Sequence, residues 1–227
     1  MDKNLKQIVW ILMLLIFPVA SYAQEDVTKF LDIPVDGYKP EMIEKLKSRG
    51  FTNNSEVRDI LDGEFNGHDV NIFIITNNNK VWRIAVQDKY PTDETNIKIR
   101  FNKLIQQFLN NKRYSTPSDS LISKFIIPKD EDIQYEMSVN NKQYQASFLQ
   151  KAIKSDSLTY EIDKLIAKEG NNEEDYEKAN DLILERMQVE LNTLNKNVWF
   201  MINEDYGEYR ILMFYDNKLN KANGEGL

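Results

Sequence analysis

The segment from about residue 58 to 88 constrains the fold more than any other part of the sequence. Apolar and polar residues alternate along it, and a period of two is typical of half-buried strands. Asn66-Gly67 divides the segment and favours a two-residue turn, because both residues tolerate positive φ. A second, three-residue turn is expected at 77–79. The sequence therefore predicts a three-stranded meander whose buried face comprises Leu61, Phe65, Val70, Ile72, Ile74, Trp82, Ile84 and Val86.

Two helices are expected to flank the meander. The first spans about 40–49, with Pro40 in its first turn and Gly50 just past its end. Its apolar side is Met42, Ile43 and Leu46. The second follows the meander, and we expect it to cover the meander's apolar face. Its stripe is Ile97, Phe101, Leu104, Ile105 and Phe108.

A second group of elements is expected after a linker or long turn at 113–120. The alternating stretch 133–148 predicts a hairpin with its turn at Asn140-Asn141. Two amphipathic helices follow, the first ending at Gly170 and the second capped by Asn172. Their stripes are Leu158, Ile162, Leu165 and Ile166 in the first, and Tyr176, Ala179, Ile183, Met187, Leu191 and Leu194 in the second.

These elements predict an α+β fold: an antiparallel sheet built from hairpins and a meander, with amphipathic helices packed on one face. We expect a signal peptide at 1–23, a helix–meander–helix half at 24–113, and a hairpin–helices–hairpin half at 114–227. The two halves can also form one continuous domain.

The last hairpin, 197–216, carries large apolar side chains on both faces. Gly207 predicts a three-residue loop that pairs Ile202 with Arg210, which leaves one aliphatic, core-like face. The second face is either covered by the rest of the chain or exposed as a docking platform, since Met, Tyr and Trp suit interfaces. The candidate partner-binding residues on it are Trp199, Met201, Tyr209, Met213 and Tyr215.

The first 23 residues have the order of a secretory signal peptide. Lys3 and Lys6 precede an apolar run, and small residues lead to a cleavage site expected after Ala23. A membrane anchor is the alternative, although the run is shorter than the roughly 20 residues that a bilayer requires. We therefore expect a periplasmic or secreted protein with no transmembrane segment after signal removal. The chain has no cysteine, which excludes disulfides, thiolate chemistry and lipid attachment to a cysteine.

The charge of the chain argues against nucleic acid as a partner. Its net charge is −7, and removal of two lysines and one aspartate with the signal peptide makes it −8. An acidic chain without clustered lysines repels phosphate backbones.

The sequence offers little chemistry for catalysis, and we predict no catalytic residues, no metal and no cofactor. His68 is the only histidine and follows a turn, so it reads as an ordinary turn residue. The acidic run 129–132 lacks the spacing of a calcium loop. A carboxylate-dependent hydrolase remains a less favoured alternative, because paired carboxylates meet only in the fold. The candidates are Glu64, Glu204, Asp205 and Glu208.

Three blocks carry a resemblance to a known group of proteins: KFLDIPVDGYKPEMIEKLKSRGF, LDGEFNGHDVNIF with NNNKVWRIAV, and VWFMINEDYGEYRILMFYDNKLNKANGEGL. Together they resemble an uncharacterised family of exported proteins from gut anaerobes, which implies no activity. The order of short helix, meander and further helix is also similar to β-lactamase-inhibitor proteins and small outer-membrane assembly lipoproteins. That likeness implies protein binding without catalysis, although the lipidation cysteine of the lipoproteins is missing.

These observations favour a non-catalytic exported protein that binds a protein partner, or its own copy, through a sheet surface. The alternative is a binder of a small amphipathic or glycan ligand, with Trp199, Tyr209 and Tyr215 as stacking groups. A flat exposed patch would favour a partner, and a concave pocket would favour a ligand.

Overall fold

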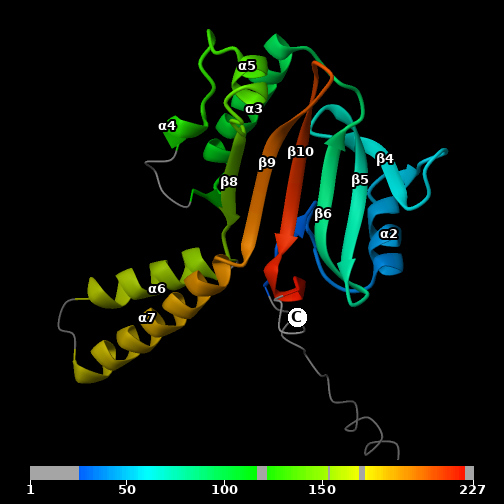
Figure 1. The fold of residues 1–227 in the computed structure, drawn as a ribbon. Coiled ribbons are helices and arrows are strands. Elements are labelled where there is room, and N and C mark those ends of the chain that lie inside the picture. The colour runs from blue at the N-terminus through cyan, green and yellow to red at the C-terminus, as the bar shows by residue number, and fades with distance from the viewer. Residues whose placement is uncertain (1–25, 117–121, 153, 169–171, 223–227) are drawn as a thin grey trace, which may run out of the picture.

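The computed structural model describes residues 26–116, 122–152, 154–168 and 172–222, so the predicted signal peptide lies outside the described residues. Within these ranges, eight strands form one antiparallel sheet in the order β3-β4-β5-β6-β10-β9-β8-β7 (Figure 1). Helices pack against this sheet, which confirms the predicted α+β fold. The strands are β3 Thr52–Asn53, β4 Ile60–Phe65, β5 His68–Asn77, β6 Lys80–Asp88, β7 Tyr114–Ser115, β8 Gln145–Gln150, β9 Lys196–Asp205 and β10 Glu208–Asn217.

The helices and the short N-terminal strands complete the described chain. The helices are α2 Lys39–Lys47, α3 Glu94–Asn110, α4 Ile122–Phe125, α5 Ile133–Ser138, α6 Ser155–Ile166, α7 Glu173–Thr193 and the 3-10 helix η2 Lys218–Asn220. A separate two-stranded ribbon consists of β1 Lys29–Phe30 and β2 Ile33–Pro34. The predicted linker therefore holds β7, while residues 117–121 lie outside the described residues.

The meander exists, with one correction to its register. Strands β4 and β5 pair Phe65 with His68, as the Asn-Gly turn predicts. Strands β5 and β6 pair Ile74 with Ile84, whereas we expected Trp82. The expectation was wrong because the turn contains two residues, Asn78 and Asn79, both at positive φ, and the register shifts beyond Ile75. Val81 enters the core in consequence, and Trp82 is only half-buried.

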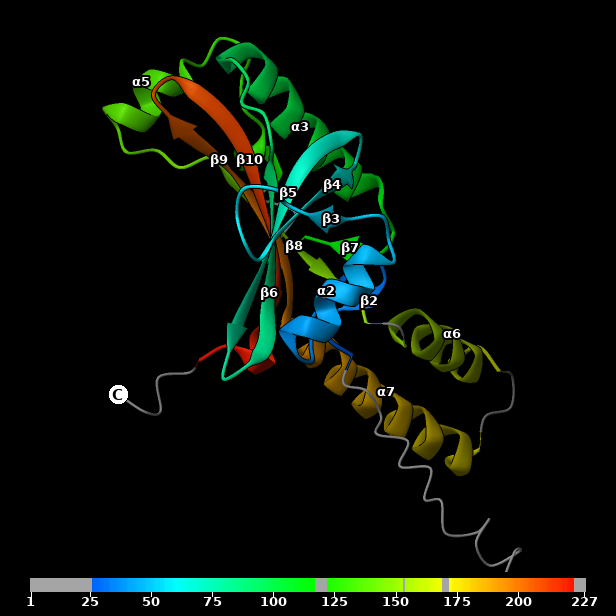
Figure 2. The same ribbon diagram turned by 90° about the vertical axis from the view of Figure 1, so that its right-hand side faces the viewer.

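The core lies on one face of the sheet, beneath α2 and α3 (Figure 2). The predicted stripe of α3 is buried from Ile97 to Phe108, and Asp93 caps the helix by accepting a hydrogen bond from the Asn96 amide at 2.9 Å. Helix α3 packs mainly on β10 and also contacts β7 and β9, whereas α2 covers β5 and β6. The prediction that α3 covers the meander was wrong in this respect, because the last hairpin joins the same sheet next to β6.

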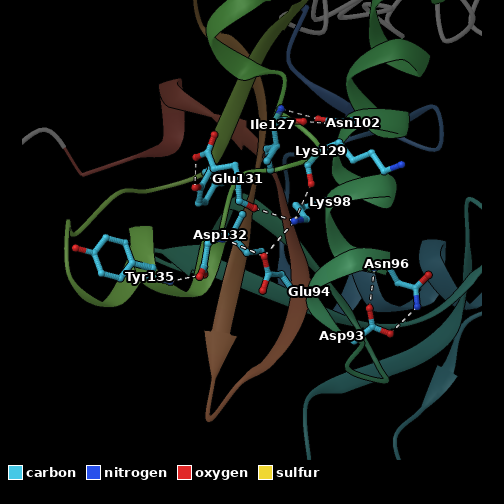
Figure 3. A network of polar contacts seen from close by, with 12 residues as sticks. Asp93, Glu94, Asn96, Lys98, Asn102, Ile127, Lys129, Glu131, Asp132 and Tyr135 are labelled. Carbon is cyan, nitrogen blue, oxygen red and sulfur yellow. Dashed lines mark hydrogen bonds and ion pairs between the residues drawn. The ribbon is translucent and has the colours of Figure 1, made fainter.

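The stretch predicted as a hairpin at 133–148 contains helix α5 and strand β8 instead. Asp132 caps α5 by accepting a hydrogen bond from the Tyr135 amide at 2.8 Å, and a capped helix competes with the alternating pattern. Helix α3 anchors this segment: Glu94 accepts a hydrogen bond from the Ile133 amide at 3.1 Å. Lys98 donates to the carbonyl of Glu131 at 2.8 Å, and it also pairs with Glu94 at 3.1 Å (Figure 3).

Helices α6 and α7 form a hairpin that projects away from the sheet, as Figures 1 and 2 both show. We call it the arm. It connects β8 to β9, two strands that are neighbours in the sheet. Asn172 and Asp175 form a capping box at the start of α7, as the sequence predicts for Asn172.

Candidate partner-binding surface

The predicted docking face is divided between the two sides of the sheet. Strands β9 and β10 are joined by a two-residue turn, Tyr206-Gly207, in which both residues have positive φ. This turn pairs Ile202 with Ile211, whereas the expected three-residue loop would have paired it with Arg210. The one-residue difference turns every β10 side chain to the opposite face from the one we expected.

Three of the five candidate residues are therefore in the core. Tyr209, Met213 and Tyr215 are only 2%, 4% and 4% exposed, so their assignment to an exposed platform was wrong. Trp199 and Met201 lie on the other face and are half-buried. Of the five candidates, only these two lie on the side of the sheet opposite the core.

The face that carries Trp199 and Met201 consists of three rows of side chains that follow the strand pairing. The middle row runs Ile60, Phe73, Ala85, Phe214, Trp199 and Ser147 across β4, β5, β6, β10, β9 and β8. One flanking row is Ile75, Arg83, Asp216, Asn197 and Leu149. The other is Asp62, Asn71, Gln87, Leu212, Met201 and Gln145. We call this surface the open face, because no α-helix of the described residues covers its strands on the side toward the viewer in Figure 1, where only the short η2 contacts β6 at one end.

An aromatic and ionic cluster occupies the middle of the open face. The rings of Trp199 and Phe214 stack with their centroids 4.2 Å apart. The guanidinium of Arg83 lies 4.3 Å from the ring centroid of Trp82 and 4.7 Å from that of Phe214, within the range of cation–π attraction. Asp216 holds this guanidinium and accepts a third hydrogen bond from the indole nitrogen of Trp199 at 3.1 Å. The cluster is thus fixed in position, and its charges cancel.

Sequence reasoning missed most of this cluster. Phe214 was assigned to the core face by the wrong register, and Arg83 and Asp216 were not singled out. Asp216 could have been found only with the register in hand, because it pairs with Arg83 across β10 and β6. The signal for Trp82 was hidden by the register shift in β5 and β6.

The open face also holds an unpaired acceptor. The side-chain oxygen of Asn71 is buried and has no hydrogen-bond donor among the described residues. A buried polar atom without a partner destabilises a fold by about 1–3 kcal/mol. The described chain therefore leaves one buried polar atom of this face without a hydrogen bond.

Tyr215 and Met213 instead contribute to a hollow on the helix side of the sheet. Its volume is about 520 Å³, within the range of small-ligand sites. Phe65, Phe108 and Tyr114 also line it, and Lys29, Arg113 and Glu64 bring charge to it. Burial raises the pKa of Tyr215 and that of Tyr114, so both phenols are neutral at ordinary pH.

The candidate carboxylates take ordinary turn positions. Glu204 accepts a hydrogen bond from the Gly207 amide at 2.7 Å, and Asp205 pairs with Glu208 in the ladder. Glu64 lines the hollow described above. His68 is exposed in β5, and partial burial together with Arg100 lowers its pKa. The described residues contain no group of three or more His, Asp or Glu side chains that could hold a metal ion.

Comparison of the chain with known protein families, with curated proteins and with solved structures finds no match. None of the helices in the described ranges has the length and apolar character to cross a membrane.

Proposed function

We propose that this protein is a non-catalytic exported binding protein that acts through the open face of its sheet. One observation carries the proposal: a row of apolar side chains runs across the sheet, and no described helix covers it. A contiguous apolar patch of this kind marks an interaction site more often than a free surface. Trp and Arg are also the residue types that contribute most at interfaces, and the face presents Trp199 and Arg83 in a fixed arrangement.

A second copy of the chain is the occupant that this face fits best. Arg83 is neutralised by Asp216, and Asp62 by Lys89 at 3.0 Å, so the three rows of two copies can meet without bringing unpaired like charges together. Symmetric dimers are the commonest assemblies of soluble proteins, and they join the same patch on both subunits. A different protein partner remains an outcome of the test.

The test is the oligomeric state of the mature chain, measured by size exclusion with light scattering over a range of concentrations. We expect the wild type to dimerise and Leu212→Glu to be monomeric, because Leu212 is half-buried on the open face. Ile99→Glu is the matched control, since Ile99 is exposed on α3, away from this face. Near-ultraviolet circular dichroism establishes that each variant is folded.

A wild-type protein that stays monomeric at all concentrations would contradict self-association. Equal dimerisation of wild type and Leu212→Glu would contradict the open face as the interface. A folded wild-type monomer that forms a complex with a purified partner, lost only in Leu212→Glu, would replace the second copy by that partner.

The hollow beside Tyr215 supports a second candidate, the binding of a small amphipathic ligand. Aromatic walls and charged groups at its edge suit a molecule with an apolar chain and a polar head. Octyl glucoside below its micelle concentration is a suitable probe, followed by nuclear magnetic resonance. We expect shifts at Tyr114 and Met213 that disappear in Gln107→Trp, which would fill the hollow. Shifts elsewhere, or none, would contradict this candidate.

A further inference from the structure

Helix α7 carries the most prominent exposed apolar surface of the described chain. Five of its apolar side chains and that of its C-cap Leu194 are between 37% and 63% exposed, whereas the sequence pattern predicts all of them except Leu184 on the buried side of the helix. We call them the α7 stripe: Tyr176, Ile183, Leu184, Met187, Leu191 and Leu194. Of the stripe predicted from the sequence, only Ala179 is buried.

The arm holds together without the α7 stripe. Helix α7 turns a different side toward α6, with Ala179 buried and Leu182 and Val189 half-buried. Helix α6 contributes Leu158 and Ile162, which are both buried. Single exposed apolar residues are common on protein surfaces, but a stripe along a whole helix is typical of a binding face.

The net charge of helix α7 indicates which kind of partner the α7 stripe can bind. Helix α7 has seven Asp and Glu residues and two Lys and Arg residues, a net charge of −5. Glu177 and Asp181 follow one another at a four-residue spacing beside Leu184, along one border of the stripe. On the other border Glu190 is paired with Arg186 at 2.9 Å. The border formed by Glu177 and Asp181 therefore keeps its negative charge, whereas the border at Glu190 is neutralised.

A second copy would bring the same acidic borders together, and like charges across an interface are unfavourable. An anionic membrane surface would repel the helix for the same reason. A cationic amphipathic helix avoids both of these repulsions. Its apolar side can cover the stripe while its lysines or arginines face Glu177 and Asp181.

We propose that the α7 stripe is the docking surface for a cationic amphipathic helix of another protein. This inference is independent of the proposed function, because the stripe lies on the arm and not on the open face. The two surfaces differ in the electrostatic property that selects a partner: the open face is balanced, and α7 is strongly negative.

The test uses the mature full chain and a synthetic helical peptide with leucine at core spacing and lysine on its other sides. Two control peptides complete the set: one with glutamate for lysine, and one with the same composition as the first in scrambled order. Binding is measured by fluorescence anisotropy. We expect the lysine peptide to bind at least tenfold more tightly than either control. We also expect its affinity to fall several-fold between 50 and 300 mM salt, because salt screens the charges.

Leu184→Ser/Met187→Ser removes the centre of the stripe without changing charge, and we expect it to weaken peptide binding at least tenfold. Ile99→Ser is the matched control, since Ile99 is comparably exposed on α3, away from the arm. Both altered side chains of the double variant are exposed, and thermal unfolding confirms that the fold is kept. Glu177→Gln/Asp181→Asn should weaken binding and reduce its salt dependence.

Three results would overturn the proposal. Equal binding by wild type and Leu184→Ser/Met187→Ser would mean that the attraction is electrostatic and does not involve the stripe. Dimerisation of the wild type that the same double variant abolishes would identify a second copy as the occupant. Binding to phosphatidylglycerol vesicles that the double variant abolishes would identify a membrane surface.

Discussion

Arg83 and Asp216 face one another across β6 and β10 and form a two-pronged ion pair on the open face, with N–O distances of 2.6 and 2.7 Å. The carboxylate side chain is almost buried and the guanidinium is largely so. Charge-assisted pairs of this geometry are stronger than ordinary hydrogen bonds. The pair therefore links the meander to the last hairpin at the point where the two halves of the chain meet.

Asp216→Asn is expected to lower the free energy of unfolding by about 2–4 kcal/mol, because it leaves the Arg83 guanidinium without its counter-charge in a low-dielectric site. Urea unfolding measures the effect. Asp59→Asn serves as the control, since the pair of Asp59 with Lys39 at 3.3 Å is solvent-exposed and should contribute less than about 1 kcal/mol. Similar losses in the two variants would show that the Arg83 pair is not special.

Gly63→Ala is expected to destabilise the protein by about 1–3 kcal/mol, the usual effect of overpacking. A Cβ at residue 63 would lie 2.3 Å from the ring of Phe51, which is itself buried. The double variant Gly63→Ala/Phe51→Leu gives the new methyl group space. Urea unfolding should show less loss in it than the two single changes add up to. Additive losses would contradict this steric explanation.

Asn71→Leu is expected to leave stability unchanged or raise it by about 1 kcal/mol, because it removes a buried acceptor that lacks a donor. Thermal and urea unfolding of the variant measure the effect, with Asn203→Leu on β9 as a control on the same face. A marked loss of stability would mean that the Asn71 oxygen has a donor.

Stability is expected to fall as the pH rises above about 10. Burial raises the pKa of Tyr209, Tyr215 and Tyr144. A hydrogen bond to Glu131 raises the pKa of Tyr144 further. The folded state therefore keeps protons that the unfolded state loses above pH 10, so this stability is present below pH 10 and is lost above it. Urea unfolding from pH 8 to 11.5 tests the slope, and phenolate absorbance should rise together with unfolding. Tyr215→Phe should make the slope smaller, and an unchanged slope would contradict the role of Tyr215.

Local turn chemistry decided which parts of the fold could be predicted. Asn66-Gly67 fixed the register of β4 and β5 because an Asn-Gly pair strongly favours one turn type. The turn at Tyr206-Gly207 was misread because Tyr rarely adopts positive φ, yet Tyr206 has φ of +53°. One residue of difference there moved Tyr209, Met213 and Tyr215 from the predicted surface into the core.

The helices show a different limit. The period of α7 was read correctly from the sequence, but a period identifies an apolar side without saying what covers it. In α3 the predicted side packs in the core, whereas in α7 most of it faces solvent. The difference arises from topology, since α3 lies against the sheet and α7 projects from it.

The position of the arm allows the sheet and helices α6 and α7 to change independently in evolution. Leu149 near the end of β8 already lies beside Asn197 near the start of β9, so the ladder between them closes whatever the chain does in between. Lineages could lengthen, shorten or exchange the intervening helices while the sheet stays the same. The binding surface on the arm can then change while the strands and the core stay the same.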